Sequence, residues 1–129
     1  MANSNSGAPS RAAVIAGWII GILPALMMVF SGAMKFMMSP EVQDSFKHLG
    51  WPVEKANTLG ILELACTAIY FFPRTAILGA ILLTGYLGGA TATHVRIGDP
   101  WFFPVVIGIL FWLSLYLRDM RVREVLPLR

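Results

Sequence analysis

Four long runs of mainly apolar residues, separated by short polar segments, make up most of the chain. Each run is close in length to the roughly 20 residues that an α-helix needs to cross the hydrocarbon core of a bilayer. The predicted fold class is therefore all-α, with four transmembrane helices in a single domain over residues 11–129. Because short connections favour antiparallel neighbours, we expect these helices to form an antiparallel bundle. Residues 1–10 are small and carry no charged side chain, which predicts a disordered polar tail. The predicted helices cover residues 12–38, 53–72, 75–95 and 100–118.

The polar segment between the first two runs has a helical pattern of its own. Ser39 is a favoured N-cap residue and a proline follows it, as is common at the first position of a helix. Apolar side chains then recur at i, i+4 and i+7 over residues 42–49, and Gly50 supplies a stop. This spacing predicts a short amphipathic helix on the membrane surface, with His48 as a solvated side chain.

One carboxylate interrupts the second apolar run. Glu63 is the only charged residue within residues 56–72, and the helix rise places it about 13 Å below Glu54, near the bilayer midplane. A charge at that depth costs several kcal/mol, so such residues usually face a bundle interior and have a partner. Two interpretations stay open at this point: a site for a ligand or a proton, or a carboxyl that only ties two helices together.

Small residues gather on one side of the first and third predicted helices. Gly17 and Gly21 match the GxxxG pattern that lets two helices approach closely, and Gly85 and Gly89 form a second such pair. We therefore expect both pairs to mark helix-packing faces, within the chain or between two copies of it.

Polar side chains at the ends of the first and third helices share one membrane side with Glu63 beneath them. Lys35 is separated from Glu63 by about 8 Å of helix rise, which a lysine stem or one water can nearly close. The plainer alternative is a lysine that snorkels to the interface. We predict an outward-opening polar pocket between the first three helices, with Glu63, His94 and Lys35 as catalytic, proton-handling or ligand-contacting candidates. Its predicted lining consists of Ser31, Lys35, Glu63, Thr67, Tyr70, Thr91 and His94.

Two residues near this pocket have plainer alternatives. His94 lies at a helix end, where water or backbone can satisfy its ring nitrogens. Arg96 is a further ligand-binding candidate, but a loop ion pair or a cap formed with Asp99 is the simpler interpretation, because residues 98–100 form a turn.

Composition supports the membrane interpretation. The chain is 57% hydrophobic and 13% charged, whereas a soluble domain carries about 25% charged residues. The net charge of +3 is scattered over helix ends, which excludes nucleic-acid binding. Six Lys and Arg residues fall on the side of the two termini and four on the other. The positive-inside rule therefore predicts a multi-pass protein of the cell (inner) membrane with both termini in the cytoplasm.

Metal and thiol chemistry find little support. The single cysteine, Cys66, excludes an intramolecular disulfide and a CxxC thiol relay. The two histidines offer no metal-like spacing and no haem ligation, so neither metal nor haem is predicted.

Five motifs together resemble the DoxX-like family of small four-helix membrane proteins: SGAMKF at residues 31–36, PEVQDSFKHLGWP at 40–52, LGILELACTAIYFFPR at 59–74, LGA at 78–80 and THVRIGDP at 93–100. The resemblance spans residues 29–127. It implies a four-helix bundle in which Lys35, Glu63, His94 and Arg96 occupy the family's polar positions. It also implies an association with membrane redox chemistry, since relatives include a quinone-reducing thiosulfate oxidoreductase subunit and a partner of superoxide-detoxifying and sulfurtransferase proteins. A more distant eukaryotic branch is similar to receptor-assembly chaperones.

Three functional hypotheses follow. The favoured one is a subunit of a membrane redox system that binds a quinone or a small hydrophobic metabolite, and any enzymatic role is that of an oxidoreductase subunit. A proton-coupled exporter working as a homodimer is the second. A non-catalytic scaffold or assembly factor is the third. The expected partners are the lipid bilayer, a quinone or similar ligand, and a redox protein or a second copy of the chain.

Overall fold

The structure, a computed structural model, describes residues 8–126, and these residues form helices connected by short turns. No strand occurs within this range, so the predicted all-α class is confirmed. The prediction of a disordered tail concerns residues 1–10, of which 1–7 lie outside the described residues, and Ser10 caps the first helix. The elements are α1 (Arg11–Met37), α2 (Pro40–Leu49), the 3-10 turn η1 (Val53–Lys55), α3 (Ala56–Phe71), α4 (Ala76–Arg96), α5 (Phe102–Arg118) and α6 (Met120–Val125).

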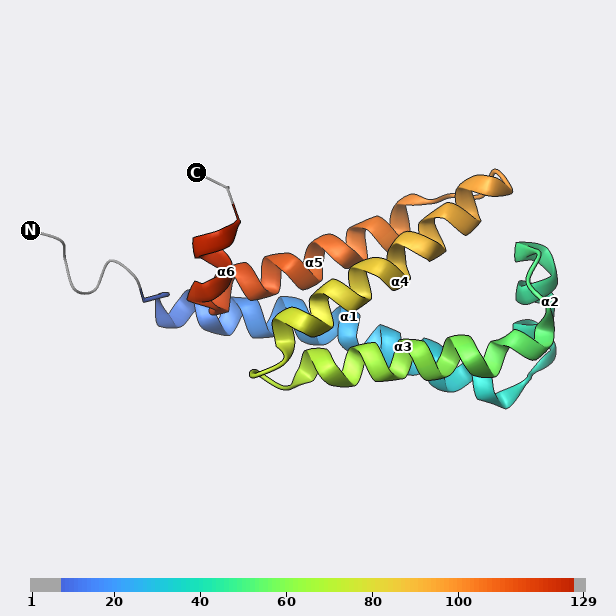
Figure 1. Ribbon diagram of the computed structural model, residues 1–129, viewed down its shortest axis with the longest axis horizontal. Coiled ribbons are helices and arrows are strands. Elements are labelled where there is room, and N and C mark those ends of the chain that lie inside the picture. Colours follow the sequence, from blue (N-terminus) through green and yellow to red (C-terminus); the bar gives the residue numbers. More distant parts are fainter. Residues whose placement is uncertain (1–7, 127–129) are drawn as a thin grey trace, which may run out of the picture.

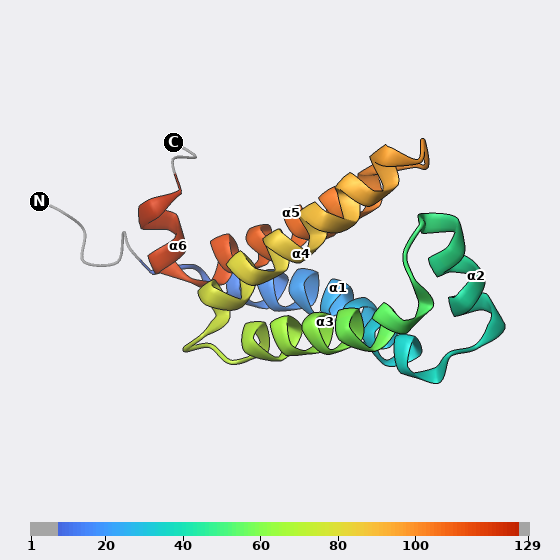
Figure 2. The same ribbon diagram turned by 45° about the vertical axis from the view of Figure 1, so that its right-hand side comes forward.

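The four long helices form a ring. Helix α1 packs against α3 and α5, and α4 packs against the same two neighbours. The start of α1 lies near α6 at one end of the molecule, and α2 lies at the opposite end (Figure 1). The α4–α5 pair diverges from the α1–α3 pair toward the α2 end, as both views show (Figure 2). The ring is therefore tight at the α6 end and wide at the α2 end.

Glycine accounts for the tight end. A Cβ built at Gly21 would lie 2.3 Å from Ser114 Oγ, and one at Gly17 would lie 2.8 Å from the Ser114 carbonyl oxygen. The Ser114 hydroxyl also donates to the Gly17 carbonyl at 2.6 Å. The Gly17/Gly21 prediction is therefore confirmed, because only the missing side chains let α5 approach α1 so closely.

The second glycine pair behaves differently. A Cβ at Gly85 or Gly89 would meet no atom within 4 Å, and the same is true of Gly88. The expectation that Gly85 and Gly89 pack on another helix is wrong within this chain. Their helix stands away from its neighbours where the ring widens, so this face of α4 is open.

The outer surface is strongly apolar. Large side chains such as Leu23 and Phe30 on α1 are 63% and 68% exposed. By length and composition α1 and α4 can each cross a membrane, and α5 is a shorter apolar helix. Such a contiguous apolar exterior is what a lipid environment would cover.

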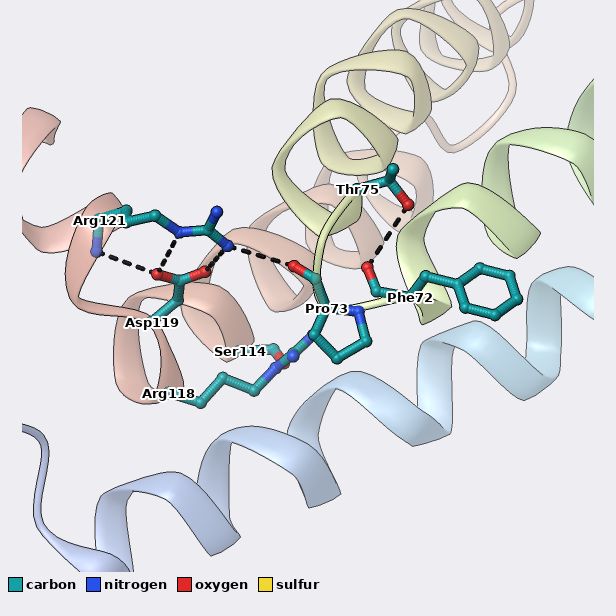
Figure 3. A network of polar contacts seen from close by, with 7 residues as sticks. All are labelled: Phe72, Pro73, Thr75, Ser114, Arg118, Asp119 and Arg121. Atoms are coloured by element: carbon teal, nitrogen blue, oxygen red, sulfur yellow. Dashed lines mark hydrogen bonds and ion pairs between the residues drawn. The ribbon is translucent and has the colours of Figure 1, made fainter.

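Helix α6 was not predicted, and a short polar network attaches it to the tight end. Asp119 follows the last residue of α5 and caps the start of α6, and its carboxylate accepts from the Arg121 backbone N–H at 3.0 Å. The Arg121 guanidinium contacts Asp119 Oδ2 at 2.7 Å and donates to the Pro73 carbonyl in the α3–α4 turn at 3.2 Å (Figure 3). Hydrogen bonding from Arg121 holds the pKa of Asp119 below its usual value. The network therefore joins the chain's last helix to the turn between α3 and α4.

Candidate functional site

A cavity of about 580 Å³ lies among the helices where the ring widens. Most of its wall is apolar, contributed by α1, α3, α4 and α5 and closed on one side by residues of α2 and the turn after it. The lining comprises Met27, Met28, Ser31, Lys35, Phe46, Leu49, Trp51, Leu59, Glu63, Gly85, Tyr86, Leu87, Gly89, Ala90, Thr93, His94, Phe103, Pro104 and Ile107.

A small polar cluster, defined as Ser31, Lys35, Glu63 and Tyr86, forms part of this wall. Lys35 Nζ lies 2.6 Å from Glu63 Oε2 and 2.9 Å from Ser31 Oγ. The Tyr86 hydroxyl donates to the same Glu63 Oε2 at 3.0 Å. The cluster thus joins α1, α3 and α4 around one carboxylate oxygen.

Burial makes this pair energetically demanding. The Glu63 side chain is 2% exposed and that of Lys35 is 16% exposed. Removing one partner of such a buried pair leaves an uncompensated charge, which typically costs about 3–5 kcal/mol. Helix rise separates the two residues by about 8 Å along the helix axes, but their side chains are in direct contact. The lysine stem spans the difference because it extends along its own helix toward Glu63. The arrangement can hold a charged carboxylate inside an apolar cavity while part of it stays available to a ligand.

Helix α2 is held against the cavity through two contacts with the end of α4 and the turn after it. The Phe46 side chain is buried and lines the cavity. His48 Nε2 lies 2.6 Å from Asp99 Oδ2, and the Arg96 guanidinium donates to the Leu49 carbonyl. Helix α2 therefore closes one side of the cavity.

These contacts correct two predictions. Asp99 pairs with His48 and not with Arg96, since Arg96 is drawn to the backbone at the end of α2. His48 keeps an exposed ring, at 63%, but is paired rather than merely solvated. The sequence separation of about 50 residues hid both partners, because only the folded arrangement of α2 and α4 brings them together.

Four of the predicted lining residues do line the cavity: Ser31, Lys35, Glu63 and His94. Within residues 8–126, His94 Nδ1 is the one buried side-chain nitrogen or oxygen atom without a hydrogen-bond partner, and it lies 4.0 Å from Asp99 Oδ2. His94 is therefore placed on the cavity wall with an unused ring nitrogen.

The other three predicted lining residues, and the further candidate Arg96, lie elsewhere. Thr67 is fully buried and donates to the Glu63 carbonyl, while Tyr70 donates to the Phe111 carbonyl at 3.2 Å in the core of the tight end. Thr91 donates to the Leu87 carbonyl and lines a separate groove of about 470 Å³ between α4 and α5. Arg96 contacts α2, as described. Thr67 and Thr91 donate to the carbonyl four residues earlier, a bond that threonine makes readily inside a helix.

Tyr86 is the functional candidate that sequence analysis missed. A tyrosine in an apolar helix has a hydroxyl that needs a partner, and this need was the available signal. Its position on α4 gave no indication that the partner is Glu63, 23 residues away. The contribution of α5 to the wall was also missed, because its residues there are apolar and carry no distinguishing pattern.

Comparison with known proteins identifies the family of the chain. A family model described as the DoxX-like family matches residues 19–114, which is well over half of the chain. Neither the curated proteins nor the solved structures contain a match. Within the described residues, no group of three His, Cys, Asp or Glu side chains is placed to hold a metal ion.

Proposed function

The chain belongs to the DoxX-like family, and on that premise we propose that it binds a quinone or a similar small amphipathic metabolite within a membrane redox system. Four of its helices span the bilayer as an antiparallel bundle, and α2 lies at the outer surface. Six of ten Lys and Arg residues fall on the side of the termini, which favours cytoplasmic termini. The cavity then opens toward the outer half of the membrane.

The observation that carries this proposal is the polar cluster inside an otherwise apolar cavity. Small-molecule sites are mostly apolar clefts of about 300–1,000 Å³ with a few convergent polar groups. A quinone has the matching chemistry, with an apolar ring and tail and two oxygens that hydrogen-bond. The volume of about 580 Å³ is within that range. The cluster would fix the ligand's oxygen end while the apolar wall holds the rest.

In this proposal the residues of the chain handle binding and protons. Glu63 is the acceptor for Lys35 and Tyr86, and it is also the group placed to receive a proton from a bound hydroxyl. His94 offers a second titratable group on the same wall. Electrons would pass between the ligand and a partner redox protein that docks on the membrane domain.

The open face of α4 supplies a direct test. Gly89 lines the cavity and has open space at its Cβ position, so Gly89→Phe would place a ring in the cavity. Gly88 has the same open space but lines the separate α4–α5 groove, which makes Gly88→Phe a matched control. Binding of a decyl-tailed benzoquinone to the protein in lipid nanodiscs should fall at least about tenfold in Gly89→Phe. Unchanged binding in that variant would rule out the cavity as the site.

The scaffold hypothesis makes the opposite prediction. If the polar cluster only ties helices together, the double variant Lys35→Met/Glu63→Gln, which leaves no charge buried alone, should keep partner binding and the cellular phenotype unchanged. A quinone-linked activity that is lost in Glu63→Gln, and kept when the exposed Glu54 is replaced by Gln, would support the proposed function instead.

A further inference from the structure

We propose that the cavity selects a ligand head group that brings a hydrogen-bond donor, so that it binds the hydroxyl-bearing quinol in preference to the oxidised quinone. This inference rests on the proposed function and concerns which form of the ligand the same site takes. It follows from the donors and acceptors that the polar cluster leaves unused.

The donors of the cluster are nearly all occupied. A lysine ammonium carries three protons, and three acceptors lie within 3.5 Å of Lys35 Nζ: Glu63 Oε2, Ser31 Oγ and the Ser31 carbonyl. The Tyr86 hydroxyl has one proton and donates it to Glu63 Oε2. Neither the lysine nor the tyrosine therefore has a proton left for the carbonyl of a ligand.

An acceptor, in contrast, is free. Both hydrogen bonds to the Glu63 carboxylate end on Oε2, and Oε1 accepts none from residues 8–126. Oε1 is not one of the fully buried atoms left without a partner, since His94 Nδ1 alone has that status in the described part of the chain. Oε1 therefore keeps some accessible surface, and Glu63 is among the residues that line the cavity. A carboxylate oxygen that loses water when a ligand binds, without gaining a donor, carries a desolvation penalty.

A ligand hydroxyl can pair with both groups that remain available in the cluster. It can donate to Glu63 Oε1, and it can accept from the Ser31 hydroxyl, whose oxygen already accepts from Lys35. A quinone carbonyl or a methyl ether has acceptors alone and would leave Oε1 unpaired. His94 can serve as donor or acceptor depending on its tautomer, so it does not set the preference. The cluster thus discriminates by what the head group donates.

Three matched probes test the preference: a decyl-tailed benzoquinone, its quinol, and the dimethyl ether of that quinol. Their affinities for the full chain in lipid nanodiscs would be measured anaerobically by separating bound from free ligand. Because a hydrogen bond to a charged group is among the stronger ones, we expect the quinol to bind at least about tenfold tighter than the other two. Quinone or ether binding as tight as quinol binding would overturn this inference and leave the proposed function standing. Absence of binding by all three would overturn the proposed function itself.

Two variants locate the preference. Glu63→Gln can present an amide N–H₂ to the cavity, so the quinol preference should fall to about twofold or reverse. Tyr86→Phe removes a donor but keeps Glu63 Oε1, so it should retain the preference. Loss of the preference in Tyr86→Phe, or its full persistence in Glu63→Gln, would contradict the assignment to Oε1. The probe series on the unaltered chain decides the proposal even if a variant fails to fold.

Discussion

Lys35 Nζ and Glu63 Oε2 lie 2.6 Å apart and join α1 to α3 on the wall of the cavity. The two helices also pack directly, with a Cβ at Gly32 on α1 placed 2.8 Å from the Leu64 side chain on α3. The pair therefore connects helices that are already in close contact, and its charge is held where water has little access.

Removing the lysine should destabilise the fold. In Lys35→Met the Glu63 carboxylate keeps its burial and loses its cation, which should lower the free energy of unfolding by about 3–5 kcal/mol. Thermal unfolding in the same detergent measures this change. The double variant Lys35→Met/Glu63→Gln should recover most of the loss, because no charge is then buried alone. Lys55→Met, at an exposed lysine, is the matched control and should have little effect.

Glycine substitutions at the tight end and on the open face of α4 should have different effects on stability. Gly21→Ala places a methyl group where Ser114 Oγ already lies, so α1 and α5 must move apart and stability should fall by about 1–3 kcal/mol. Gly88→Ala meets no atom within 4 Å and should be neutral or slightly stabilising, since alanine is the better helix former. Equal losses of thermal stability in the two variants would contradict the packing described for α1 and α5.

The α6 network should make stability depend on pH through Asp119. Because Arg121 lowers the pKa of Asp119 in the folded state, its contribution is fully present above the ordinary aspartate value of about 4. It is lost as the pH falls through the lower folded-state pKa. The melting temperature of the unaltered chain should therefore fall more than that of Asp119→Asn between about pH 5 and pH 3. Parallel curves for the two proteins would show that the ion pair adds nothing. Glu41→Gln, at an exposed acid on α2, serves as the control.

The contacts that hold α2 should limit its opening. Arg96→Gln shortens the side chain that donates to the Leu49 carbonyl, so backbone hydrogen exchange over residues 40–49 should accelerate several-fold. Asp99→Asn, which removes the charge facing His48, should act in the same direction. Lys47→Gln changes an exposed residue of the same helix and should leave exchange rates as they are. Unchanged exchange in both Arg96→Gln and Asp99→Asn would mean that neither polar contact limits the opening of α2 and that packing of Phe46 holds the helix.

Much of the architecture was predictable from periodicity. Helices α1, α3, α4 and α5 begin and end within about three residues of the predicted boundaries, because apolar run length and Pro or Gly breakers are local properties. The cap at Ser39 and the stop at Gly50, with φ of 78°, were predicted for the same reason. Helix α6 was missed because it is short and because its contact with the rest of the fold, from Arg121 to Pro73, joins residues 48 apart in the sequence.

The candidate site was likewise predictable only where it depends on local sequence. The sequence by itself determined that Glu63 would be buried with a partner, and it indicated Lys35 as that partner. Both follow from local features of the sequence: a charge within an apolar helix, and the helix face on which a residue lies. Only the tertiary structure decided that Tyr86 completes the cluster, that Tyr70 and Thr67 do not line the cavity, and that Asp99 contacts His48. Those outcomes depend on how far α4 and α5 diverge from α1 and α3. That divergence is set by packing between helices distant in sequence, which no single segment encodes.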